Sequence, residues 1–390
     1  MNRSLPALPA GGRRLTTRAC SLCFLALLLL GTSLTLSAQT KDKKDLMVTG
    51  PKANGTDLMK IKPDGPAPDW APDIDPQMQA VIEQLMSYEA PPFPTLTAFQ
   101  VRNAKLPAAA VADLMKKTGT RPMQPAVDIS HRLLPVGSDD GTLVRVYKPV
   151  NAPGTLPVIV YYHGGGWVIA DLDTYEGGAA ALAEQANAIV VSVAYRQAPE
   201  HTFPTAHEDA FAAYQWVVEN TDSLGGDPDR IATAGESAGG NLAVAVSLMA
   251  RERDVQLPVH ILSVYPIADG DTESDSYTKY AKALPLGKEF MAWFFDYYYP
   301  EWESSSDPLI SLTSADLSGL PPVTIVNAQI DPLEAEGGEL EQKLREAGID
   351  VEREVYQGVT HEFFGMGAVL EQAQEAQKFA ADRLKTAFKQ

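Results

Sequence analysis

From about residue 128 onward, apolar segments that look like strands alternate with segments that have helical spacing. Near-continuous Val and Ile runs predict buried strands at 141–149, 157–163, 188–196, 231–237, 259–266, 323–331 and 351–357. Most of the segments between them have the spacing of helices, namely 173–186, 205–218, 238–251 and 334–347. Strands of this kind alternating with helices predict an α/β fold in which a mostly parallel sheet is covered on both faces.

The chain before the sheet divides into two further regions. Residues 76–127 form a predicted helical cap, because apolar positions recur there at helical spacing and are interrupted only by the prolines of 91–94. Residues 39–75 are rich in Lys, Asp and Pro and predict an extended arm. The catalytic domain would then span 128–390, with an acidic and then aromatic insertion at 269–322 that contributes to the cap.

The first 38 residues have the order of an export signal. Four arginines and no acids precede an apolar run at 24–36, and the small residues Ser37 and Ala38 follow it. The run is too short for a spanning helix, which needs about 20 residues, so we expect cleavage near Ala38 rather than a permanent membrane anchor. The protein would then be periplasmic or extracellular, and the Sec and twin-arginine routes both stay open.

Charge and cysteine content narrow the function further. Loss of the four leader arginines would lower the formal net charge from −18 to −22, and such a surface repels nucleic acid and anionic membranes. Both cysteines, Cys20 and Cys23, would leave with the leader, which excludes a disulfide framework or a cysteine nucleophile in the mature chain. The motifs have no metal-ligand spacing, so we expect no metal and no cofactor; the oligomeric state stays open.

The candidate nucleophile is Ser237, in the sequence GESAG at residues 235–239. This pentapeptide joins the predicted strand IATAG to the predicted helix AGGNLAVAVSLMA. A turn between strand and helix this tight holds the serine in strained backbone geometry, and side chains at either glycine position would collide with the neighbouring elements. Outside this context the pattern also fits an ordinary Gly-rich turn.

A second motif, HGGGW at residues 163–167, directly follows the predicted strand PVIVYYH. Its glycines expose backbone N–H groups, which an oxyanion developing on a carbonyl oxygen requires. The N–H of Ala238, at the start of the helix after the nucleophile, would be their partner. The alternative is a flexible turn with a buried, hydrogen-bonded histidine.

The base is found by elimination among six histidines. The order nucleophile, acid, base along the chain leaves only His260 and His361. His260 opens a predicted strand soon after the serine, whereas His361 lies in GVTHEFFG after the last strand and could reach Ser237. We therefore predict His361 as the base and a structural role for His260.

The predicted acid is Asp331, which ends the strand before that base. Its carboxylate would hold the tautomer of His361 and stabilise the protonated imidazole. Asp296 and Asp307 are the competitors, but neither ends a predicted strand.

Several residues near these motifs have weaker assignments. Trp167, Glu236 and Tyr195 are candidates for substrate contacts because they flank the motifs. The segment that begins YRQAPEH at Tyr195 predicts an Arg/Glu pair that fixes a loop. The aromatic segment MAWFFDYYYP (residues 291–300) either packs in the core or lines an acyl pocket, and both interpretations stay open.

Together, HGGGW, YRQAPEHTFPTAHEDAFAAYQW, GESAGGN, AQIDPLEAEG and GVTHEFFG resemble the hormone-sensitive-lipase-like carboxylesterases of the bacterial family IV type. The resemblance covers about residues 76–388. It implies the α/β-hydrolase fold with an eight-stranded sheet, a triad of Ser237, Asp331 and His361, and an oxyanion hole built from Gly165, Gly166 and Ala238.

The resemblance also implies hydrolysis of esters of short to medium acids. Family members often have Asp where this chain has Glu236, and Asp-Glu-Gly at residues 335–337 where it has Ala-Glu-Gly. We therefore expect a serine carboxylesterase acting on a small-molecule ester through an acyl-enzyme. The alternatives are an amidase or other acyl hydrolase with the same triad, and a non-catalytic small-molecule binder.

Overall fold

The computed structural model describes residues 58–121, 125–302 and 306–389, all of which belong to one compact unit. The predicted export signal (1–38) and much of the predicted arm (39–75) lie outside the described residues. Within the described ranges, no helix combines the length and the apolar character that crossing a membrane requires.

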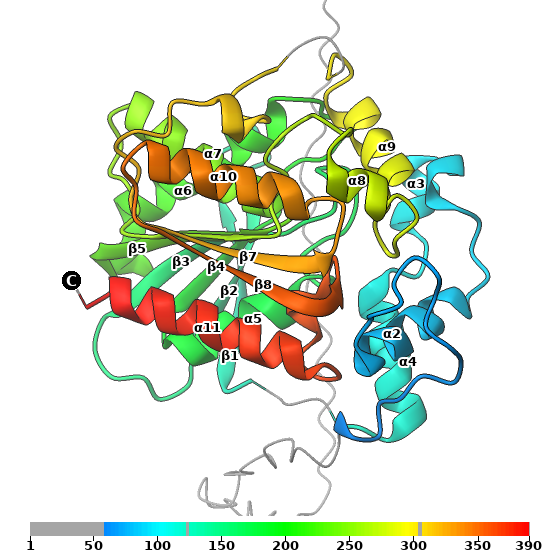
Figure 1. The fold of residues 1–390 in the computed structure, drawn as a ribbon. Coiled ribbons are helices and arrows are strands. Elements are labelled where there is room, and N and C mark those ends of the chain that lie inside the picture. Colours follow the sequence, from blue (N-terminus) through cyan, green and yellow to red (C-terminus); the bar gives the residue numbers. More distant parts are fainter. Residues whose placement is uncertain (1–57, 122–124, 303–305, 390) are drawn as a thin grey trace, which may run out of the picture. The chain divides into compact units, whose positions relative to one another are not determined.

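The centre of the fold is a single sheet of eight strands (Figure 1). In spatial order these are β1 (Val127–Leu134), β2 (Thr142–Pro149), β4 (Ile189–Val193), β3 (Leu156–Tyr162), β5 (Gly226–Glu236), β6 (Ile261–Val264), β7 (Val323–Ile330) and β8 (Val351–Thr360). The β1/β2 and β2/β4 pairs are antiparallel and the other pairs are parallel. The predicted α/β fold with a mostly parallel sheet is therefore confirmed.

The strand β1 was not among the segments predicted from apolar runs. It lies at the edge of the sheet, pairs only with β2, and exposes most of its side chains. A strand of this kind buries too little to require an apolar run, so its sequence, VDISHRLL, has no such signal.

Helices cover both faces of the sheet (Figure 1). On one face lie α6 (Thr205–Leu224), α7 (Ala238–Glu252) and α10 (Glu334–Glu346), and on the other lie α5 (Glu176–Ala186) and α11 (Glu371–Ala387). Alternate residues of the central strands point into two separate apolar clusters, as Val158 and Val160 do on the first face and Ile159 and Tyr161 on the second. Two buried faces explain why the parallel strands have continuous rather than alternating apolar sequences.

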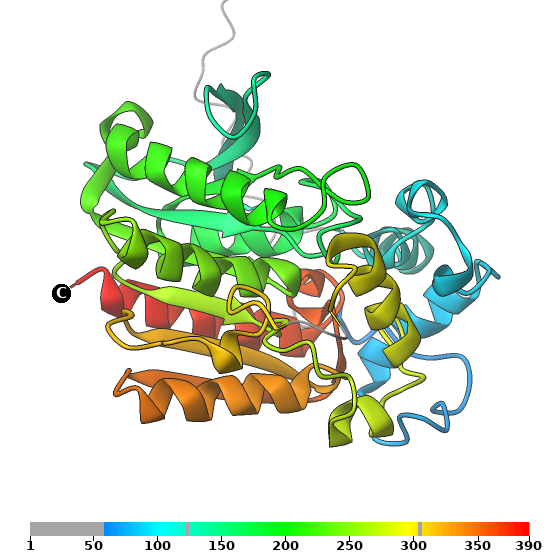
Figure 2. The same cartoon turned by 90° about the horizontal axis from the view of Figure 1, so that it is seen from above.

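Two groups of short helices lie beside the sheet. The N-terminal group comprises α2 (Pro76–Met86), η2 (Phe93–Thr95), α3 (Ala98–Arg102) and α4 (Pro107–Thr118). The predicted insertion between β6 and β7 contributes α8 (Asp275–Lys279), α9 (Lys288–Tyr298) and η3 (Leu312–Ser314). The two groups lie side by side in both views (Figures 1 and 2). They are joined by a hydrogen bond from the indole N–H of Trp293 to the carbonyl of Leu96 at 3.0 Å.

Candidate active site

The turn between β5 and α7 places Ser237 in a backbone conformation that is rare for a side-chain-bearing residue. Its φ is +59° and its ψ is −121°. The two glycines of the motif have no room for a side chain. A Cβ at Gly235 would lie 2.0 Å from the carbonyl oxygen of Gly239, and a Cβ at Gly239 would lie 1.9 Å from that of Tyr162. The collisions expected from the sequence are therefore present, and they explain why both positions are glycine.

Three residues that lie far apart in the sequence form a hydrogen-bonded chain beyond the carboxyl ends of β5, β7 and β8. His361 Nε2 lies 2.9 Å from the Oγ of Ser237, and His361 Nδ1 lies 2.6 Å from the Oδ2 of Asp331. The second carboxylate oxygen of Asp331 accepts the backbone N–H of Leu333 at 3.0 Å, which fixes its orientation. All three side chains are buried. The structure thus brings together the residues that the sequence predicted as nucleophile, base and acid.

Charge separates His361 from the other buried histidines. Burial alone would lower the pKa of His361, but the charge of Asp331 and its hydrogen bond outweigh burial and raise that pKa above its usual value. Burial lowers the pKa of His163, His207 and His260 to about 4 in each case, so these three rings stay neutral. Among these four rings, only His361 is stabilised in the protonated form that a base must adopt during a reaction.

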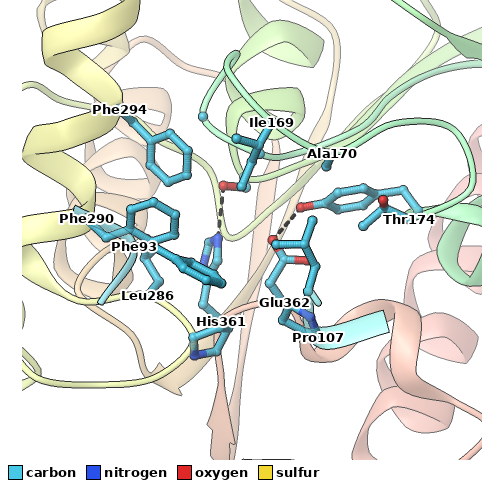
Figure 3. Close-up of a pocket in the computed structure, with 16 residues that line it drawn as sticks. Phe93, Pro107, Ile169, Ala170, Thr174, Leu286, Phe290, Phe294, His361 and Glu362 are labelled. Atoms are coloured by element: carbon cyan, nitrogen blue, oxygen red, sulfur yellow. Dashed lines mark hydrogen bonds between the residues drawn. The ribbon is translucent and has the colours of Figure 1, made fainter. Parts of the chain in front are cut away.

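A compact pocket of about 40 Å³ opens above Ser237 and His361 (Figure 3). Apolar side chains gather on one side of His361, and a more polar side lies opposite (Figure 3). The apolar side comprises Phe93, Leu286, Phe290 and Phe294. The other side has Thr174 and Glu362 among the apolar residues Pro107, Ile169 and Ala170, and Tyr175 donates a hydrogen bond to Glu362. Part of the aromatic segment therefore lines the pocket, while Phe295 and Tyr298 are buried in the core.

The HGGGW loop adopts a backbone that glycine favours. Gly165 and Gly166 have φ values of +98° and +57°, and both line the pocket next to Ser237. A Cβ at Gly166 would lie 2.2 Å from the ring of Phe294, so the loop and the aromatic wall are in close contact. Ala238 is the first residue of α7, where its N–H is one of those with no partner within the helix. These are the positions predicted for an oxyanion hole.

Glu236, next to the nucleophile, faces away from the pocket. Its carboxylate accepts hydrogen bonds from the hydroxyls of Tyr161 and Tyr265, and it packs against Gly178 of α5. Burial raises the pKa of Glu236 to about 7, although both tyrosine bonds oppose that shift. The ring of Tyr265 lies 4.6 Å from the ring of His361, so Glu236 holds a side chain that contacts the predicted base.

In the described part of the chain, none of the three residues suggested for substrate contacts lines the pocket. Trp167 is fully buried and stacks on Tyr298, with ring centroids 4.7 Å apart. The hydroxyl of Tyr195 donates to the carbonyl oxygen of His163 at 2.7 Å and so supports the glycine loop from below. These side chains and Glu236 hold the loops that form the site.

Two other expectations concern residues around the site. His260 bonds Thr324 at 2.9 Å, in agreement with a structural role. The predicted Arg/Glu pair of the YRQAPEH segment was wrong in its partner, because Arg196 pairs with Asp209 at 2.6 Å. Glu200 instead pairs with Arg102 of α3. Asp209, on α6, accepts hydrogen bonds from the backbone N–H, Nε and Nη2 of Arg196.

The sequence analysis missed three polar residues that shape the site. Glu362, which follows the base, lines the pocket and accepts a hydrogen bond from Tyr175. Glu336 accepts the backbone N–H groups of Ala268 and Asp269 at 2.5 and 2.6 Å. Asn241 donates to two carbonyl oxygens of the insertion and its flank, each at 3.0 Å. The only signal for them was that they lie within the GVTHEFFG, AQIDPLEAEG and GESAGGN motifs.

Comparison with known proteins agrees with this geometry. Residues 159–365 match the model of an α/β-hydrolase-fold family, so the chain is an α/β-hydrolase. It is 36% identical to the carboxylesterase NlhH of Mycobacterium tuberculosis over 310 residues, which cover 78% of this chain and 93% of that protein. The chain therefore belongs to the hormone-sensitive-lipase-like carboxylesterases and is a carboxylic ester hydrolase.

Further relatives and solved structures agree. Ethyl acetate hydrolase of Pseudomonas putida is 34% identical over 236 residues, which cover 60% of this chain and 74% of that protein. The crystal structure of a hyperthermophilic esterase from the archaeon Pyrobaculum calidifontis superimposes with a TM-score of 0.72 at 33% identity. The match covers 80% of this chain and 98% of that one.

Proposed function

We propose that the protein hydrolyses its ester substrates through a covalent acyl-enzyme on Ser237. The observation that carries the proposal is the continuous chain of hydrogen bonds from Ser237 Oγ through His361 to Asp331. His361 Nε2 takes the hydroxyl proton as Oγ attacks the ester carbonyl, and it returns that proton to the departing alcohol. A water molecule, deprotonated by His361, then attacks the acyl-enzyme carbonyl; the acid is released and Ser237 Oγ regains its proton from His361.

In this proposal the negative charge of each tetrahedral intermediate is stabilised by backbone N–H groups of Gly165, Gly166 and Ala238. Asp331 holds His361 in the tautomer that presents Nε2 to the serine, and its charge stabilises the imidazolium. No cofactor has a part in these steps. The small volume of the pocket, about 40 Å³, supports esters of short acids as the substrates.

The proposal is tested with p-nitrophenyl acetate, butyrate and octanoate on the chain without residues 1–38. We expect the highest kcat/KM on the two shorter esters, and a loss of about 10⁶-fold in kcat for Ser237→Ala. Unchanged circular dichroism spectra would confirm that the variant is folded. Turnover by Ser237→Ala equal to that of the wild type would refute the serine mechanism. A wild-type protein that hydrolyses none of these esters would favour the alternative of a non-catalytic small-molecule binder.

The choice between ester and amide needs a matched pair of substrates. We expect p-nitrophenyl butyrate to react at least about 10³-fold faster than p-nitrobutyranilide, because the amide is intrinsically less reactive and an apolar pocket offers its N–H little compensation. Comparable rates on the two would instead identify an amidase.

Export is part of the same proposal. Residues 1–38 have the order of a signal peptide and are expected to be removed near Ala38. Expression of the full chain in a bacterial host should yield periplasmic or extracellular protein whose mass lacks the leader. Protein that retains residues 1–38 and stays with the membrane fraction would favour the alternative of a permanent anchor.

A further inference from the structure

A second and much larger apolar cavity lies beside the catalytic pocket. Its volume is about 840 Å³, against about 40 Å³ for the pocket above Ser237. One wall comes from the N-terminal helices and the loop after α2, and the other from residues 281–292 of the insertion. Apolar members of these walls include Leu85, Met86, Pro91, Pro92, Leu284 and Ala292. We call this cavity the cap groove.

The cap groove and the catalytic pocket share part of their lining. Phe93, Pro285 and Phe290 line both cavities. The rings of Phe93 and Phe290 meet edge to face, with centroids 5.4 Å apart and planes at 62°. These two rings, labelled in Figure 3, therefore form the partition between the catalytic pocket and the cap groove.

The two halves of this partition differ in how firmly they are held. Phe290 lies in the first turn of α9 and is also in ring contact with Phe294, at 4.3 Å, and with Trp293, at 5.4 Å. Phe93 is only half-buried and belongs to the short 3₁₀ helix η2, whereas Phe290 is buried. Removal of the Phe93 ring would consequently open the partition while α9 keeps its packing.

We propose that the cap groove is a subsite for the far end of an unbranched alkyl chain of the ester, and that Phe93 sets the chain length at which it is reached. This inference rests on the proposed serine esterase function. A chain that passes the partition exchanges water for the apolar walls of the groove, which is worth up to about fourfold in binding per methylene. With Phe93 in place, chains that end in the compact pocket are favoured.

The experiment compares kcat/KM for p-nitrophenyl butyrate and p-nitrophenyl laurate. For Phe93→Ala we expect the ratio of laurate to butyrate to rise at least about 10-fold, because the long chain gains apolar contacts that the short chain cannot reach. Ala292→Trp fills the groove from α9 without touching the catalytic pocket, and in the Phe93→Ala background it should cancel that gain. Phe99→Ala is the matched control, since this α3 phenylalanine is 74% exposed and lines neither cavity.

Two isomeric esters then tell which half of the substrate enters the groove. Ethyl dodecanoate carries the long chain on its acyl side and dodecyl acetate on its alcohol side, and a pH-stat follows the hydrolysis of both. A higher kcat/KM of Phe93→Ala than of the wild type on either isomer supports the subsite, and the isomer affected shows which half of the ester enters the groove. The inference is overturned if kcat/KM rises on neither isomer, or if the rise persists when Ala292→Trp is added.

The outcome is separable from that of the proposed function. If the wild type does not hydrolyse p-nitrophenyl butyrate, the esterase mechanism is refuted. If it does, but Phe93→Ala has the same ratio of laurate to butyrate as the wild type, only the subsite is refuted. A second variant, Phe93→Trp, keeps the inference testable if Phe93→Ala does not fold. Because a larger ring maintains the partition, this variant should lower the ratio of laurate to butyrate below that of the wild type.

Discussion

The floor and the roof of the catalytic pocket are built in different ways. The floor comprises Ser237, His361 and the glycine loop, which follow the carboxyl ends of β5, β8 and β3. The roof comprises Phe93, Leu286, Phe290 and Phe294, which come from the N-terminal helices and from the insertion between β6 and β7. The order of strands therefore fixes the floor, while the roof depends on segments outside the sheet.

This difference assigns separate consequences to substitutions in the two regions. In the proposed mechanism the floor makes hydrogen bonds that any ester would use, so its residues should affect all substrates alike. The roof makes apolar contacts that depend on the shape of the substrate, so its residues should change the ratio between esters. Each of the following substitutions tests that division.

The largest effect is expected from the base. His361→Ala removes the group that takes the Ser237 proton in the proposed mechanism, and it should lower kcat by about 10⁶-fold on every ester. The control is His260→Ala, whose ring bonds Thr324 away from the pocket. That variant should melt at a lower temperature but keep most of its kcat per folded molecule. A greater loss of kcat at His260 would overturn the assignment.

Asp331→Asn should have the next largest effect. It keeps the shape of the acid but removes its charge, and a loss of about 10⁴-fold in kcat is expected. Since the charge of Asp331 helps to raise the pKa of His361, the variant should also have a lower pKa there. In the proposed mechanism wild-type activity should fall as pH drops through the pKa of His361, so in the variant this acid limb should move to lower pH. An unmoved limb would exclude the carboxylate as the partner of His361.

A roof substitution should act selectively. Phe294→Ala removes the ring that contacts Gly166 and enlarges the pocket beside the predicted oxyanion hole. We expect kcat/KM for p-nitrophenyl pivalate, which has a branched acyl group, to rise relative to acetate by about 10-fold. Equal changes on both esters would show that this part of the roof acts on catalysis itself and would break the division between floor and roof.

The smallest effect is expected from Glu236, beneath the floor. Glu236→Gln can keep both tyrosine contacts while removing a charge that helps to raise the pKa of His361. The acid limb of kcat/KM should therefore move to lower pH, with a plateau within about threefold of the wild type. A purely structural role would lower the plateau and leave the limb in place.

The same substitution has a consequence for stability. Burial raises the pKa of Glu236 to about 7, so the folded wild type binds this proton more tightly than the unfolded chain does. Wild-type stability should consequently decrease as pH rises from the unfolded pKa of about 4.3 toward 7. In Glu236→Gln this decrease should be smaller, as thermal melts at pH 5 and pH 7.5 would reveal.

The floor could be predicted from the sequence because each of its parts has a local signal. GESAG and HGGGW each follow an apolar strand run, and chain order leaves few candidates for the base and the acid. The fold could be predicted for the same reason, because its buried strands have apolar runs, whereas the exposed edge strand β1 has none.

The roof and the supports of the floor could not be predicted in this way. The contact between Phe93 and Phe290 joins segments almost 200 positions apart, and no periodicity encodes such a pairing. The orientation of Glu236 depends on tyrosines from β3 and from the turn after β6, and only the folded chain brings them together. The sequence could therefore name Glu236 as unusual but could not tell which way it points.

The anchoring of the insertion gives the fold a further property. At its start, Glu336 of α10 binds the N–H groups of Ala268 and Asp269. Toward its end, Asn241 of α7 binds the carbonyl of Ile310. Both anchors belong to helices that pack on the sheet, whereas Phe290 and Phe294 of the segment between them line the pocket. We therefore expect that replacing this segment by that of a relative would change which esters are accepted.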